Sequence, residues 1–131
     1  MDLVVLMKAI LSIKPEYVDR ILSGEKKYEF RKRIFKREDV DTIVIYSTSP
    51  CCKVVAEARI AEIIYDSPER IWKKTKDNSG IAKEQFMNYF NGREIAYAIR
   101  LATVKQLAEP CSLNEYAPQV KAAPQSFVYV Q

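Results

Sequence analysis

The sequence predicts an α+β fold, a small and partly open β-barrel of five to six strands with peripheral helices. Five or six segments have the alternating or continuously apolar pattern of β-strands, and an early helix and a helical insert interrupt them. The 131 residues suit one domain and contain no internal repeat, low-complexity segment or linker. We therefore expect residues 1–131 to form a single domain. An α/β sandwich is the alternative.

The first part of the chain predicts a strand, a helix and a second strand. Residues 8–14 alternate as a strand, and the apolar residues 1–7 form its start or a lead-in to it. Pro15 suits the first position of a helix, and Gly24 is placed to end that helix in a left-handed conformation. The next strand begins near Lys27.

The middle of the chain predicts two strands and a helical insert. Residues 41–49 form a largely buried strand, and residues 53–65 form one long enough to bend around a barrel. Ser67 precedes Pro68 as a helix start should, and a second helix is expected over residues 81–90.

The end of the chain predicts two further strands around a short helical turn. Residues 94–107 alternate as a long strand. Ser112 and Glu115 have the spacing of a capping box, and residues 127–130 form a final strand.

The composition excludes several kinds of chemistry. Without histidine, the chain has no Ser-His or Cys-His nucleophile pair and no imidazole acid or base. Cys51, Cys52 and Cys111 are odd in number and form no C-x-x-C, so we expect neither a disulfide framework nor a metal site. No P-loop or dinucleotide glycine pattern is present, and we expect no cofactor.

The N-terminal apolar run does not suggest a membrane protein. Residues 1–7 are too few to span a bilayer, and Lys8 interrupts them. They also have no positive n-region or evident cleavage site. We expect a cytoplasmic protein with no membrane partner.

The net charge of +4 lies in one segment. Residues 25–38 hold seven Lys or Arg and three Glu, whereas the rest of the chain has fourteen of each sign. Lys32, Arg33, Lys36 and Arg37 flank Phe35, and basic residues around an aromatic side chain suit single-stranded RNA. A solvated charged face is the plainer interpretation. Tyr28 and Phe30 are expected to be core residues.

The same segment contains the pattern G-x-K-x-x-E-x-R, formed by Gly24, Lys26, Glu29 and Arg31. Glu29 and Arg31 lie two apart on the expected strand, so both side chains leave one face. Arg31 can grip a phosphate, and Glu29 can accept from a base amino group. Lys26 needs only its charge to contact a phosphate, but a lowered pKa to act as a base. A surface ion pair between Glu29 and Arg31 is the plainer alternative.

These residues resemble a known family. The runs LSIKPEY (residues 11–17) and ILSGEKKYEFRKR (residues 21–33) resemble the N-terminal motif of the ASCH domain, a member of the PUA-like superfamily. The ending PQSFVY (residues 124–129) resembles that of small stand-alone prokaryotic members. The resemblance implies a small β-barrel with a cleft lined by the motif and an RNA or nucleotide ligand. The family is proposed to act in RNA binding, transcription coactivation and RNA processing.

The resemblance also implies an enzymatic alternative. Some small bacterial members are amidohydrolases that act on acetylated cytidine, with a lysine matching Lys26 as base and a threonine where this chain has Glu29. Glu29 cannot serve as a hydroxyl nucleophile, so the chain departs from that pattern.

We therefore favour an RNA-binding or modified-nucleotide-binding cleft. Its recognition centre would be Lys26, Glu29 and Arg31, with Lys14 and Arg33 at its edge. The alternative is a metal-independent hydrolase, an amidohydrolase or a ribonuclease, with Lys26 as base and Glu29 as partner, and Glu84 as a weaker candidate. A third hypothesis is a protein-interaction module whose basic face meets an acidic protein.

Overall fold

The structure is a computed structural model that describes residues 6–131, and in this range it contains six β-strands, four α-helices and one 3₁₀-helix. The strands are β1 (Met7–Ile13), β2 (Tyr28–Arg31), β3 (Val40–Ser47), β4 (Lys53–Asp66), β5 (Ala96–Cys111) and β6 (Val128–Val130). The helices are α1 (Pro15–Ser23), α2 (Pro68–Thr75), the 3₁₀-helix η1 (Lys76–Asn78), α3 (Lys83–Tyr89) and α4 (Leu113–Tyr116).

The strands form one mixed sheet in the order β2-β5-β4-β3-β1-β6. Only β1 and β3 are parallel, and the chain between them contributes α1 and β2. The α+β class, the six strands and the peripheral helices are confirmed. The hydrogen-bonded order ends at β2 on one side and β6 on the other, so the sheet is not closed into a barrel.

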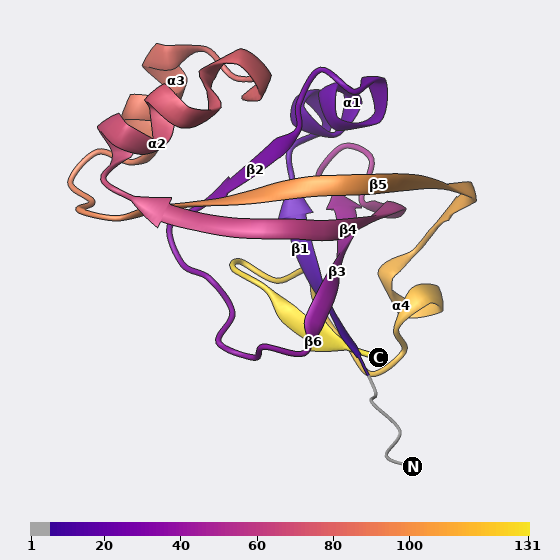
Figure 1. The fold of residues 1–131 in the computed structure, drawn as a ribbon. Helices are drawn as coiled ribbons and strands as arrows, with labels where there is room; N and C mark the ends of the chain where they lie inside the picture. The colour runs from indigo at the N-terminus through magenta and orange to yellow at the C-terminus, as the bar shows by residue number, and fades with distance from the viewer. Residues whose placement is uncertain (1–5) are drawn as a thin grey trace.

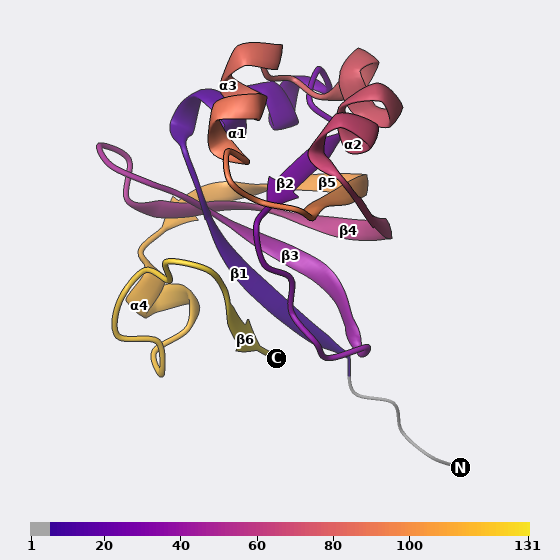
Figure 2. The ribbon, with the colours of Figure 1, turned by 90° about the vertical axis from the view of Figure 1, so that its left-hand side faces the viewer.

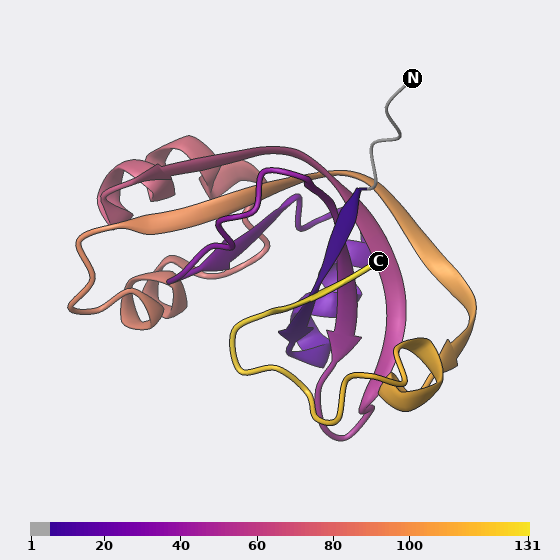
Figure 3. The same cartoon turned by 90° about the horizontal axis from the view of Figure 1, so that it is seen from below.

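The two longest strands, β4 and β5, form the bent centre of the sheet. Their pairing shifts register at three places, and such irregularities bend a strand and increase its twist. α2 and α3 lie at one end of the pair and α4 at the other, as Figures 1 and 3 show. β5 extends past the predicted end at residue 107 because its pairing with β4 continues to Cys111.

Helix α1 follows the predicted start and stop signals. Pro15 occupies its first position, and Gly24 adopts a left-handed conformation with φ of 87° just after its end. Val18 and Ile21 are buried against residues of the sheet. The helix is therefore held at a fixed place above the end of β1.

The helical insert packs on β2 through aromatic side chains. Phe30 of β2 meets Phe86 of α3 edge to face, with ring centroids 4.9 Å apart, and Phe90 adds a second edge contact to Phe86. The prediction that Phe30 is a core residue is confirmed. Figure 2 shows α1, α2 and α3 gathered on the same side of β4 and β5. This packing places α3 opposite α1.

Both predicted side-chain caps are confirmed. The Ser67 hydroxyl accepts a hydrogen bond from the Arg70 amide at the start of α2, and the Ser112 hydroxyl accepts one from the Glu115 amide in α4. The predicted second helix of the insert is shorter than expected, since α3 begins only at Lys83. The residues before Lys83 instead form a turn next to Lys26.

Three further expectations concern the start of the chain, the cysteines and a membrane-spanning helix. β1 begins at Met7, and the prediction for residues 1–5 lies outside the described residues. The three cysteines are free thiols. Within residues 6–131, no helix has both the length and the apolar character that a bilayer crossing requires.

Phe35 belongs to the core and does not offer a ring for base stacking. It is buried and packs edge to face on Phe127, with ring centroids 5.7 Å apart. The basic residues Lys32, Arg33, Lys36 and Arg37 around it are exposed. The interpretation of Phe35 as part of a basic and aromatic RNA surface is therefore wrong, because its ring anchors the loop between β2 and β3.

We predict that Phe35→Ala lowers the free energy of unfolding by about 3–5 kcal/mol, because it leaves a cavity under this loop. Phe35→Leu should cost much less, since it keeps most of the buried volume. Urea unfolding of the two variants and the wild type measures both changes. A loss below about 1 kcal/mol for Phe35→Ala would contradict the core position.

Candidate functional site

A cleft of about 500 Å³ opens between α1, α3 and the strands β1 and β2. It brings together the lysine, the glutamate and the arginine of the motif. Its lining residues are Ser12, Ile13, Lys14, Glu16, Tyr17, Lys26, Glu29, Phe30, Arg31, Ile81, Gln85, Asn88 and Tyr89. Across the opening, the Tyr17 hydroxyl of α1 lies 3.5 Å from the Gln85 side-chain oxygen of α3.

Lys26 is the buried cation of this cleft. Its side chain is only 3% exposed, and its Nζ donates a 2.7 Å hydrogen bond to the Ser79 carbonyl oxygen. The ammonium also lies 4.6 Å from the ring centroid of Phe30 and 5.3 Å from that of Tyr17. Aromatic faces attract a desolvated cation, so the two rings and the carbonyl partly replace the water that Lys26 has lost.

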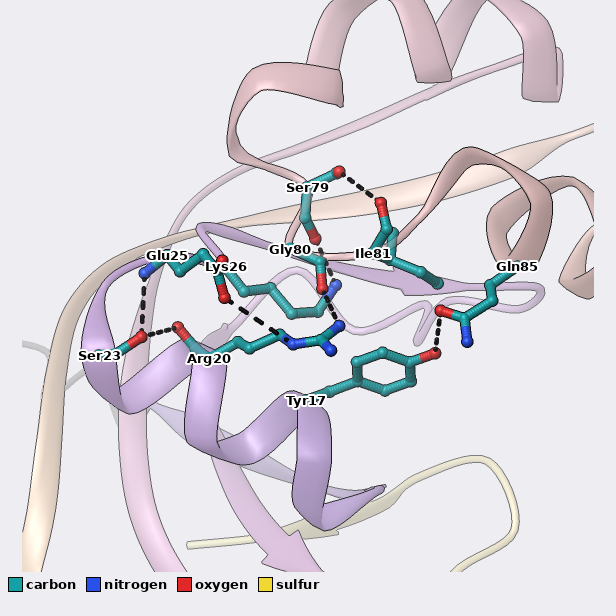
Figure 4. A network of polar contacts seen from close by, with 9 residues as sticks. All are labelled: Tyr17, Arg20, Ser23, Glu25, Lys26, Ser79, Gly80, Ile81 and Gln85. Carbon is teal, nitrogen blue, oxygen red and sulfur yellow. Dashed lines mark hydrogen bonds and ion pairs between the residues drawn. The ribbon is translucent and has the colours of Figure 1, made fainter.

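The backbone at Lys26 and Lys27 is held by the last turns of α1 and by residues 78–80 of the insert. The Lys26 amide donates to the Arg20 carbonyl at the end of α1, and the Arg20 Nη1 donates to the Gly80 carbonyl, each at 2.9 Å. The Lys27 amide donates to the Asn78 carbonyl, also at 2.9 Å. Figure 4 shows the Arg20 side chain passing beneath Lys26 toward Gly80.

Gly80 allows this close approach. Its φ is +62°, and a Cβ built on it would lie 2.3 Å from the Cβ of Lys26. Any larger residue would therefore push the turn away from the lysine. The Ser79 hydroxyl lies 3.2 Å from the carbonyl oxygens of Lys76 and Ile81, and its one proton is shared between these two acceptors.

Burial lowers the pKa of Lys26 to about 8. The Glu29 carboxylate raises this pKa and the Arg20 guanidinium lowers it, but both effects are smaller than that of burial. At pH 7 about a tenth of the molecules then carry a neutral amine at this position. The lowered pKa that a general base requires is therefore present.

Glu29 and Arg31 lie on one face of β2, as predicted, and form a buried ion pair with 3.3 Å between Oε2 and Nη1. Arg31 also donates to the Ser12 carbonyl at 3.3 Å and to the Ser126 carbonyl at 2.6 Å. These contacts use three of the five guanidinium N–H groups, and the other two have no hydrogen-bond partner within residues 6–131. Glu29 Oε1 accepts no hydrogen bond within residues 6–131, so one carboxylate oxygen is available to a ligand.

The other predicted residues lie at different distances from the cleft. Lys14 is exposed and lines its rim. Arg33 is exposed but is not among the lining residues, and the same holds for Glu84. The neighbours Gln85 and Tyr89 on α3 line the cleft instead, because they lie on the helix face that meets α1.

Two tyrosines of the cleft were missed as site residues. Tyr17 belongs to the apolar stripe of α1, a pattern that predicts core packing, yet it is only half-buried and lines the cleft. The Lys32 ammonium lies over the ring of Tyr89, 4.7 Å from its centroid. The alignment of Ile81, Gln85 and Tyr89 at helical spacing was the signal that could have located this wall. Burial raises the pKa of both tyrosines, so both keep their protons at neutral pH.

Comparison with known proteins places this chain in a family. The family described as a domain of unknown function, DUF365, matches residues 7–121. An ASCH domain-containing ribonuclease of Zymomonas mobilis subsp. mobilis is 31% identical over 108 residues, which cover 82% of this chain and 72% of that protein.

Solved structures agree with this match. The crystal structure of the ASCH protein from Zymomonas mobilis has a TM-score of 0.83 and 28% identity, and the match covers 95% of this chain and 87% of that one. A tyrosine-to-phenylalanine mutant of that protein has a TM-score of 0.84 and 27% identity, with 95% and 90% covered. The chain therefore belongs to the ASCH domain family, with its PUA-like fold. The resemblance first noted around residues 11–33 is confirmed.

We predict that Gly80→Ala is more destabilising than Gly92→Ala by about 1–3 kcal/mol, because it adds a steric clash with Lys26. Both glycines have a positive φ, +62° and +79°, so both variants share the backbone strain. A Cβ at Gly92 would meet no atom within 4 Å, which makes it the matched control. Equal losses in chemical unfolding would argue against a tight contact at Gly80.

The pKa of Lys26 also predicts a pH-dependent stability. Lysine has a usual pKa of 10.5, against about 8 in the fold. Between these values the unfolded chain binds a proton that the folded chain does not, so the free energy of unfolding rises with pH. Relative to Lys26→Met, the wild type should gain about 2–3 kcal/mol from pH 7 to pH 10. Guanidinium unfolding of both proteins measures this difference, and a constant difference would contradict the lowered pKa.

Proposed function

We propose that this chain binds RNA in the cleft formed by α1, α3, β1 and β2 and acts in RNA processing. The observation that carries the proposal is the buried Lys26, which lies in an open cleft with a lowered pKa beside Glu29 and Arg31. The ribonuclease name of the relative at 31% identity supports an RNA ligand.

Each motif residue has a donor or acceptor left for such a ligand. The Lys26 ammonium and the two remaining N–H groups of Arg31 offer positive charge to one phosphate. The Oε1 atom of Glu29 accepts from a base amino group or a ribose hydroxyl. Lys14 on the rim and Arg33 beyond it would contact further phosphates.

A second candidate function is cleavage of the bound RNA without a metal. The observation that favours it is the pKa of Lys26 of about 8, together with the ribonuclease name of the relative. In this reaction the neutral Lys26 amine accepts the proton of a ribose 2′-hydroxyl. The 2′-oxygen then attacks the adjacent phosphorus, and the bond from phosphorus to the 5′-oxygen breaks.

The remaining groups of the cleft suit the other parts of this step. A protonated tyrosine, Tyr17 or Tyr89, can supply the proton that the departing 5′-oxygen takes up. Arg31 can stabilise the extra negative charge on the phosphate oxygens in the transition state. The products would be a 2′,3′-cyclic phosphate and a free 5′-hydroxyl. Hydrolysis of acetylated cytidine is less favoured, because Glu29 stands where that chemistry uses a threonine.

Binding and cleavage can be measured together. We expect the wild type to bind single-stranded RNA at low salt and Lys26→Met to bind about tenfold more weakly or worse, since it removes the charge but keeps the side-chain length. Lys27→Met is the matched control, because Lys27 is adjacent in sequence and exposed. Fluorescence anisotropy measures the affinities. A wild type that binds no RNA at low salt would overturn the proposal.

If the cleft cleaves RNA, turnover should proceed in the presence of EDTA and produce cyclic-phosphate ends. The rate should rise with pH and level off above about pH 8, where Lys26 becomes mostly neutral. Lys26→Met should lower the rate about 10²–10⁴-fold, whereas Lys27→Met should not change it. RNA binding without turnover would limit the chain to a binding function.

A further inference from the structure

Three side chains form a row across the sheet next to the cleft. In the strand pairing, Arg31 of β2 lies directly opposite Tyr97 of β5, and Tyr97 lies directly opposite Tyr65 of β4. Directly paired residues on neighbouring antiparallel strands point to the same face of the sheet. Neighbouring strands are about 4.8 Å apart, so Tyr97 is next to Arg31 and Tyr65 is about 10 Å from it.

The two tyrosines are unusual in their exposure. Tyr65 is 66% exposed, more than any other exposed large hydrophobic side chain in residues 6–131, and Tyr97 is half-buried. Their ring centroids are 5.9 Å apart and the rings are tilted by 42°. An aromatic ring that is this exposed to solvent contributes little to the core. The pair therefore presents aromatic faces to solvent beside a ligand-binding cleft.

One cation, Arg31, lies next to this pair in the strand pairing. Arg31, which begins the row, is followed in the chain by the exposed Lys32 and Arg33. They belong to the segment 25–38 that carries the net charge of +4. Aromatic faces beside cations match the bases and phosphates of a single-stranded nucleic acid, whose unstacked bases are free to lie on a ring. An acidic peptide would match the cations but not the open rings.

We propose that Tyr65 and Tyr97 form a stacking subsite for a base that flanks the nucleotide held in the cleft. This inference rests on the proposed function, because it extends the same ligand along the sheet. It also narrows the substrate class. A free nucleotide occupies the cleft alone, whereas a strand of two or more nucleotides also reaches the tyrosines, so the subsite favours single-stranded RNA over a free nucleotide.

The test compares a short and a long ligand. For an octanucleotide of single-stranded RNA, Tyr65→Ala should weaken binding about 5- to 150-fold, the usual loss for one stacked base. Binding of cytidine monophosphate should not change. Tyr65→Phe is the matched control, because it keeps the ring and should bind both ligands as the wild type does. Because Tyr65 is exposed, Tyr65→Ala should keep the melting temperature of the wild type.

The salt dependence of the RNA affinity distinguishes a contribution from base stacking from one due to phosphate contacts. Tyr65→Ala should leave the slope of log affinity against log salt unchanged, whereas Arg33→Ala should reduce its magnitude by about 1. If the wild type binds the octanucleotide and Tyr65→Ala binds it equally well, the stacking subsite is wrong while the proposed function stands. An equal loss for cytidine monophosphate would also overturn the subsite. A wild type that binds neither ligand would overturn the proposed function itself.

Discussion

The structure of the site depends on the contact between the Lys26 ammonium and the Ser79 carbonyl. A buried charge is costly unless polar groups replace its water, and this carbonyl does so with the help of two aromatic rings. The carbonyl is in place because Gly80 lets the insert approach the lysine. The insert therefore both completes the cleft and sets the acidity of its central residue.

Arg31 has a comparable role on the other side of the cleft. Its guanidinium joins β2 to the end of β1 and to the segment before β6, and neither β1 nor β6 pairs with β2 in the sheet. Because the sheet is open, this contact holds its two ends together near the site. The same side chain places an opposite charge beside the buried Glu29 carboxylate. Arg31 thus has a structural function as well as any contact with a ligand.

The local elements were largely predictable because their signals are local. The start of α1 at Pro15 and its end at Gly24 follow from backbone preferences of those residues, and the caps at Ser67 and Ser112 from short-range hydrogen bonds. The motif residues were predictable as a group, since Glu29 and Arg31 share one face of any strand. Phe35 was misjudged because its flanking charges say nothing about the direction of its side chain, and that direction is set by packing on Phe127.

The sequence by itself determined the strand and helix pattern, the family and the local excess of positive charge, because each of these depends on residues near one another in the chain. Only the tertiary structure decided that Lys26 is buried with a pKa of about 8, that α3 supplies a wall of the cleft, and that Tyr65 and Tyr97 continue the row from Arg31. Each of these depends on segments more than thirty residues apart. Their contacts arise from the packing of the insert on β2 and from strand register, which no short stretch of sequence encodes.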